Sequence, residues 1–180
     1  ACKRISESLN NDEPVVPIAV NISAKQLTSE DFAAKAISLL EQYEINPAMI
    51  EMEITESVLM ENVEVALSHL NELRAYGCRF SIDDFGTGYS SLAQLKQLPV
   101  DTLKIDRSFV RDIEVDHHDR QIVEAIIAMS HRLGLNVVGE GVETQAQLDF
   151  IDRAGCDLVQ GYLFSKPVPY EMLNEHEIVH

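Results

Sequence analysis

Short apolar runs alternate with longer amphipathic segments along most of the 180-residue chain. The runs are rich in Val, Ile and Leu and lie at 16–22, 50–54, 79–82, 102–105, 135–138 and 157–159. The segments between them have helical periodicity and predict helices at 30–43, 58–76, 119–133 and 144–154, with shorter ones near 90–98 and 169–177. This alternation is typical of α/β architecture built on parallel strands.

Glycines mark the ends of three of these helices. Gly77, Gly134 and Gly155 each follow a helical segment and precede an apolar run, so we expect the left-handed conformation that commonly terminates a helix. The repeated order of helix, glycine and strand is not interrupted by a linker, a low-complexity segment or an internal repeat. We therefore expect residues 1–180 to form one domain, with no second domain.

Nearly every apolar run ends in a polar residue whose burial would be costly. These residues are Asn21, Glu53, Asp83, Asp84, Lys104, Asp106, Glu140 and Gln160. In a parallel barrel all carboxyl strand ends meet at one mouth, whereas in an open doubly wound sheet only the ends beside a switch point share a crevice. Length favours the open sheet, because a complete (β/α)8 barrel needs about 250 residues. The polar ends favour the barrel, so we predict an α/β, TIM-like (β/α)8 barrel that is incomplete, with about six βα units.

Side-chain parity directs these polar groups to a common face. Glu51 and Glu53 lie two positions apart, as do Ser81 and Asp83, and the positions between them are apolar. Several carboxylates at one mouth repel one another unless divalent cations neutralise them. Oxygen ligands suit magnesium, manganese or calcium, and the adjacent Asp83 and Asp84 suit two metal ions that clamp a phosphoryl displacement. The residues alone therefore predict a phosphate ester as the substrate.

Any one of these residues, taken alone, could instead cap a helix or lie in a turn. A carboxylate such as Asp84, Glu56 or Glu143, taken alone, is as consistent with a helix cap or a solvated turn as with a site. The glycine-rich segment 86–91 is consistent with a mobile lid or with a simple turn, and we expect His117 and its neighbour to lie in a solvated loop. The whole set favours a site, because capping would have to be repeated at six strand ends.

The composition excludes several classes of protein. Lys and Arg total 14 against 30 Asp and Glu, for a formal net charge of -16, so duplex nucleic acid is not an expected partner. No apolar run approaches the roughly 20 residues that cross a bilayer, and the first residues lack the apolar centre of a signal peptide. The three cysteines have no CxxC spacing, which argues against a disulfide framework or a zinc cluster. We expect a cytoplasmic domain, with membrane anchoring of a longer parent protein left open.

Six motifs, in order and spacing, resemble the EAL-domain phosphodiesterases, which cleave the bacterial second messenger cyclic di-GMP. The motifs are Val20-Asn21-Ile22-Ser23, Glu53-Ile54-Thr55-Glu56-Ser57, Asp83-Asp84-Phe85-Gly86-Thr87-Gly88-Tyr89-Ser90-Ser91, Leu103-Lys104-Ile105-Asp106, Gly139-Glu140-Gly141-Val142-Glu143 and Gln160-Gly161-Tyr162. Together they span almost the entire chain. The resemblance implies a TIM-like barrel with one irregular strand, and hydrolysis of one phosphodiester bond of cyclic di-GMP to give linear pGpG.

The resemblance also implies residue roles, position by position. The implied metal ligands are Asn21, Glu53, Asp83, Asp84 and Glu140. The implied catalytic residues are Lys104, Asp84, Glu53 and Glu143, with Asp84 orienting water and Lys104 holding the attacking water or the phosphate. The implied substrate contacts are Gln160, Asp106 and Gly161. Glu56 would anchor the loop 83–91, which in the family is associated with dimerisation and regulation. The implied cofactor is Mg²⁺ or Mn²⁺ in a two-metal site, with Ca²⁺ as an inhibitory occupant.

One feature of the family is absent. The Glu-Ala-Leu motif and the arginine that follows it occur nowhere in residues 1–180, which implies that about two strands and one metal ligand are missing. We therefore expect a longer parent protein with sensor or GGDEF domains upstream, and exposed strand edges that favour homodimers or larger assemblies. Two alternatives remain: a catalytically silent module that binds cyclic di-GMP or a partner protein, and an unrelated barrel hydrolase acting on another phosphodiester.

Overall fold

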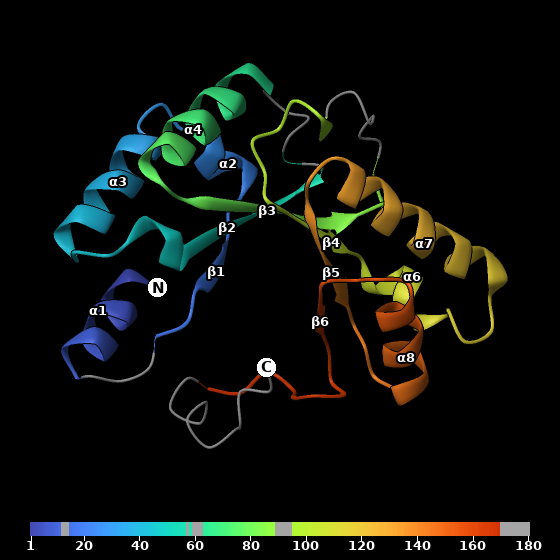
Figure 1. Ribbon diagram of the computed structural model, residues 1–180. Coiled ribbons are helices and arrows are strands. Elements are labelled where there is room, and N and C mark those ends of the chain that lie inside the picture. Colours follow the sequence, from blue (N-terminus) through green and yellow to red (C-terminus); the bar gives the residue numbers. More distant parts are fainter. Residues whose placement is uncertain (12–14, 57, 59–62, 89–94, 170–180) are drawn as a thin grey trace. The chain divides into compact units, whose positions relative to one another are not determined.

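The computed structural model describes residues 1–11, 15–56, 58, 63–88 and 95–169. The chain divides into two compact units, Ala1–Leu103 and Lys104–His180. Each unit combines β-strands with α-helices, as the ribbon shows (Figure 1). Among the described residues, no helix has the length and apolar character needed to cross a membrane.

Three parallel strands form the sheet of the first unit, namely β1 (Ile18–Asn21), β2 (Ile50–Thr55) and β3 (Arg79–Phe85). The register pairs Asn21 with Glu53 and Thr55 with Asp83. Along β2 every second residue is buried, and the residues between are half-buried. The alternation predicted from the sequence is therefore present, with an apolar face on one side and polar side chains on the other.

The helices of the first unit are α1 (Cys2–Asn10), α2 (Ala24–Leu27), α3 (Phe32–Gln42), the 3₁₀ helix η1 (Pro47–Met49) and α4 (Val63–Tyr76). A capping box formed by Ser23 and Gln26 begins α2 immediately after β1. Phe80, Leu70 and Leu73 are fully buried in the core of this unit. Burial of each such side chain stabilises the fold by about 1.5–3 kcal/mol.

The second unit contains β5 (Asn136–Glu140), β6 (Leu158–Gln160), α6 (Arg107–Arg111), α7 (His117–Arg132) and α8 (Gln145–Arg153). Strand β4 (Thr102–Ile105) contains the boundary between the units. β5 and β6 are parallel and pair Glu140 with Gln160. Val137, Val142 and Ile151 are fully buried in this unit, so the core lies between the strands and their covering helices.

All six predicted strands are present, and the three helix-ending glycines are confirmed. Gly77, Gly134 and Gly155 have φ values of 113, 77 and 85°. β3 is longer than predicted, because it continues through both aspartates to Phe85. Three short elements, α2, η1 and α6, were not predicted, since three to five residues are too few to establish a helical period. The predicted helices at 90–98 and 169–177 lie largely outside the described residues.

The loop interpretation of His117 and His118 is wrong, because α7 begins at His117. Asp116 is the N-cap of this helix, and its carboxylate accepts a hydrogen bond from the amide of His118 at 2.7 Å. A capping aspartate satisfies an amide that would otherwise lack a partner at the helix start. Local capping chemistry therefore extends the helix to residues whose side chains alone indicated a loop.

Candidate functional site

In the first unit, polar residues occupy neighbouring carboxyl strand ends. Asn21 lies opposite Glu53, and Glu53 lies opposite Ser81. Because Asp83 follows Ser81 by two positions, Asn21, Glu53 and Asp83 belong to the same face of three adjacent strands. We call these three residues the oxygen row. Amide and carboxylate oxygens are the ligands that hard divalent cations prefer, so the row is chemically suited to hold such an ion.

Asp84, which follows Asp83 on β3, has a left-handed backbone with φ of 54°. Non-glycine residues rarely adopt this conformation, and aspartate is among those that tolerate it best. The positive φ interrupts the regular alternation of the strand, so parity does not determine the direction of this side chain. Strained backbone of this kind costs about 1–3 kcal/mol and concentrates at functional sites.

Glu56 contacts the segment that follows β3. Its carboxylate is buried, and Oε2 accepts hydrogen bonds from the amides of Gly86 at 3.4 Å and Gly88 at 3.1 Å. A Cβ on Gly88 would lie 2.8 Å from the carboxyl carbon of Glu56, so a side chain at position 88 would displace this contact. The rest of the loop, Tyr89 to Ser91, lies outside the described residues.

In the second unit, the buried Lys104 forms an ion pair with the partly buried Glu140. Lys104 Nζ lies 2.7 Å from Glu140 Oε1, and the two side chains are 7% and 16% exposed. Lys104 stands on β4 between Leu103 and Ile105, which are both fully buried. A charge in such a position requires a counter-ion, and Glu140 at the end of β5 provides one. Lys104 is therefore a buried and paired lysine rather than a solvated one.

Gln160 ends β6 beside Glu140, and Gly161 follows the strand. The carbonyl of Gln160 accepts a hydrogen bond from the amide of Val142 at 3.1 Å, and the carbonyl of Val142 accepts one from Leu163 at 3.0 Å. A Cβ on Gly161 would lie 2.0 Å from the oxygen of Val142. Only glycine allows the two backbones to approach this closely. The sequence placed Gly161 in a binding motif but did not reveal this steric requirement.

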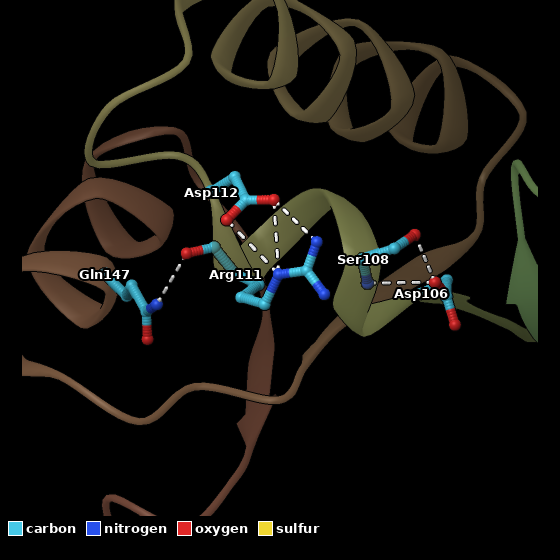
Figure 2. Close-up of polar contacts among 5 residues, drawn as sticks. All are labelled: Asp106, Ser108, Arg111, Asp112 and Gln147. Atoms are coloured by element: carbon cyan, nitrogen blue, oxygen red, sulfur yellow. Dashed lines mark hydrogen bonds and ion pairs between the residues drawn. The ribbon is translucent and has the colours of Figure 1, made fainter.

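Asp106 and Glu143 have clear local partners. Asp106 is the N-cap of α6, where its Oδ1 accepts a hydrogen bond from the amide of Ser108 at 2.9 Å and another from the Ser108 hydroxyl (Figure 2). Glu143 has an exposed side chain, and its amide donates a hydrogen bond to Gln147 Oε1 at 2.7 Å. Sequence reasoning missed Gln147, although Thr144 with Gln147 three positions later has the spacing of a capping box.

The comparison with known families decides what kind of domain this is. The family model described as "EAL domain" matches residues 1–167. The chain belongs to the EAL domain family. Its α/β class and its assignment as an incomplete TIM-like barrel of the EAL type are thereby confirmed, together with the resemblance seen in the motifs.

Individual relatives support the same family. The chain is 48% identical over 158 residues to the cyclic di-GMP phosphodiesterase NbdA of Pseudomonas aeruginosa. The aligned residues make up 88% of this chain and 20% of that protein. It thus spans about a fifth of the length of this curated relative. The solved structure titled "PaMucR Phosphodiesterase, c-di-GMP complex" is 42% identical, with a TM-score of 0.90 over 96% of this chain and 70% of that one.

Another solved structure with the same fold includes a metal. The Klebsiella pneumoniae BlrP1 structure, titled as a manganese and cyclic di-GMP complex at pH 9.0, is 29% identical to this chain. It has a TM-score of 0.82, covering 92% of this chain and 43% of that one. Divalent metal and cyclic dinucleotide therefore occur together in a member of the fold.

Proposed function

We propose that this EAL domain hydrolyses cyclic di-GMP to linear pGpG in a reaction that depends on divalent metal ions. The observation that carries the proposal is the oxygen row, Asn21, Glu53 and Asp83, on adjacent strand ends of a chain in this family. The name of NbdA and the cyclic di-GMP complex of MucR support the substrate. The buried Lys104–Glu140 pair supports phosphoryl chemistry, because a fixed ammonium can contact a phosphate oxygen.

The proposed metal ligands are Asn21, Glu53, Asp83, Asp84 and Glu140. The donor set consists of carboxylate and amide oxygens, which suits Mg²⁺ or Mn²⁺, and the manganese complex of BlrP1 supports the second. A calcium complex of the same relative supports Ca²⁺ as an alternative occupant, which we propose to be inhibitory. When bound, a pair of such cations supplies Lewis-acid stabilisation of the phosphoryl oxygens and lowers the pKa of coordinated water.

The remaining proposed roles belong to the side chains of this chain. Lys104, held by Glu140, would position the attacking water or a phosphate oxygen, and Asp84 would orient the water. Glu53 and Glu143 complete the proposed catalytic set. Gln160, Gly161 and Asp106 are the proposed substrate contacts, and Glu56 the support of the loop after β3.

We also propose a cellular setting for the domain. A parent protein with a GGDEF domain is supported by MucR, whose name describes a bifunctional diguanylate cyclase and cyclic di-GMP phosphodiesterase. The three cysteines, all within the described part of the chain, are free thiols, which supports a reducing compartment such as the cytoplasm. Homodimers or larger assemblies remain our proposal for the oligomeric state.

The test is to incubate the purified chain with cyclic di-GMP and Mn²⁺ or Mg²⁺ and to quantify pGpG by chromatography. We expect metal-dependent turnover that Asp83→Ala abolishes. Asp149→Asn is a matched control, because Asp149 lies on the exposed surface of α8 and contacts Gln145. Absence of turnover in this chain and in a longer parent, with cyclic di-GMP still bound, would reject the enzyme in favour of the silent binding module.

A further inference from the structure

We propose that Gln147 is a positioning residue for the Lys104–Glu140 pair. Gln147 joins the segment that follows Glu140 to the helix that follows Lys104, and so keeps the two strand ends in their relative positions. The inference rests on the proposed function, because Lys104 and Glu140 belong to its proposed machinery. Every contact that carries it lies within the second unit.

The side-chain amide of Gln147 makes three hydrogen bonds, two through its oxygen and one through its nitrogen. Its Oε1 accepts from the amides of Glu143 at 2.7 Å and Thr144 at 3.0 Å. Its Nε2 donates to the carbonyl of Arg111, the last residue of α6, at 3.2 Å (Figure 2). Gln147 is 5% exposed, so water does not readily replace these bonds. One buried amide thus ties the turn after β5 to the carboxyl end of α6.

The same turn contacts the other end of α6. Gly141 has φ of 71°, and a Cβ there would lie 2.5 Å from the Cβ of Arg107, the first residue of α6. The turn therefore packs against the start of the helix and is hydrogen-bonded to its end. A further bond runs from the Thr144 hydroxyl to Glu114 at 2.5 Å, just beyond α6.

The position of α6 in the chain makes this arrangement relevant to the ion pair. α6 begins at Arg107, three residues after Lys104, with Asp106 as its N-cap. The turn after β5 begins directly after Glu140. A displacement of the turn relative to α6 would be transmitted to the ends of β4 and β5, since few flexible residues intervene. Misplacement of a catalytic group by about 1 Å can reduce a rate by about 100-fold.

Gln147 also completes the capping box of α8, which could by itself explain its burial. Gln147→Glu separates the two roles. Glutamate keeps an acceptor for the amides of Glu143 and Thr144 and is favourable near a helix start. Its ionised carboxylate cannot donate to the Arg111 carbonyl, and it regains a donor when it is protonated.

The experiment measures kcat and KM for cyclic di-GMP hydrolysis, together with Tm, for the wild type, Gln147→Glu and Gln145→Ala. Gln145 is the matched control, because it lies in the first turn of the same helix and its side chain donates a hydrogen bond to Asp149, away from the turn after β5. We expect Gln147→Glu to lose about 10- to 100-fold in kcat with a much smaller change in KM. Its Tm should fall, because the ionised carboxylate faces the Arg111 carbonyl at a site that is only 5% exposed, so kcat is measured well below the Tm of the variant. Its kcat relative to wild type should recover as the pH is lowered toward about 5, because burial raises the pKa of the new carboxyl and it gains its proton there.

Three results would overturn the inference: wild-type kcat in Gln147→Glu, an equal loss of kcat in Gln145→Ala, or a loss of kcat in Gln147→Glu that disappears at temperatures well below its Tm. Amide hydrogen exchange provides a readout that does not depend on turnover. In Gln147→Glu we expect faster exchange over 104–111 and 140–144 than in the control. If the wild type shows no turnover, the proposed function fails, whereas the exchange data still decide whether Gln147 joins these segments.

Discussion

The two units hold their polar strand ends in different ways. In the first unit, Asn21, Glu53 and Asp83 are aligned by the backbone register of three parallel strands. In the second unit, Glu140 is paired with a lysine, and the turn that follows it is held by the side chain of Gln147. Backbone register does not depend on the identity of single side chains, whereas a hydrogen bond from a distant side chain does. The second unit should therefore be the more sensitive to substitution.

The largest expected effect is that of Lys104→Met. The substitution removes the counter-ion of a partly buried carboxylate, which should lower the free energy of unfolding by about 3 kcal/mol, the lower end of the range for buried pairs, and abolish pGpG production. Urea unfolding and chromatography measure the two effects. Adding Glu140→Gln should restore much of the stability without restoring turnover, and turnover at the wild-type rate in either variant would remove Lys104 from the proposed mechanism.

A smaller effect is expected from Gly161→Ala, which also tests the second unit. The new Cβ would meet the backbone oxygen and nitrogen of Val142 at 2.0 and 2.3 Å, so the backbone itself must move, at about 3 kcal/mol. Gly134→Ala is the comparison, because a Cβ there would have nothing within 4 Å, so its cost reflects only a positive φ of 77°, which Gly161 does not share. Equal unfolding free energies for the two variants would show that the close approach to Val142 is unimportant.

The first unit is tested by His69→Phe. His69 is buried on α4, and its Nδ1 lies 2.7 Å from the carbonyl of Leu27 at the end of α2. Loss of this bond should lower the free energy of unfolding by about 1–2 kcal/mol. Because strand register holds Asn21 independently of α2, kcat should remain near that of the wild type. A fall in kcat comparable to that expected for Gln147→Glu would break the contrast between the units.

The smallest effect concerns Asp157, whose pKa is lowered overall. Burial raises it, but hydrogen bonds from the His131 ring at 2.9 Å and the Val137 amide at 2.7 Å outweigh burial. A lowered pKa in the folded state stabilises the protein above the unfolded value, 3.8, and this stability is lost as the pH falls through the folded pKa. Asp157→Asn should therefore lower the unfolding free energy by up to about 1 kcal/mol at pH 7. The urea midpoints of the two proteins should converge below about pH 4; a constant difference would contradict the lowered pKa.

Local periodicity explains which features could be predicted. Strand alternation and helix-ending glycines depend on neighbouring residues, so the six strands and the polar ends such as Glu53 and Glu140 were found from the sequence. The bond between Gln147 and Arg111 joins residues 36 positions apart, and the approach of Gly161 to Val142 depends on a crossing of two backbones. Neither has a local period. Asp106 shows a different limit: the sequence did not reveal that it caps α6, and the substrate contact implied by the family resemblance stays a prediction.

The left-handed backbone of Asp84 has a consequence for any library of variants at this position. Glycine and asparagine tolerate φ of 54° well, whereas valine, isoleucine and threonine do not. A screen for folded protein should therefore enrich glycine and asparagine, while a screen for cyclic di-GMP hydrolysis should retain aspartate alone. Abundance and activity scores would thus rank the same substitutions in different orders, and variants that fold without turnover would provide substrate traps.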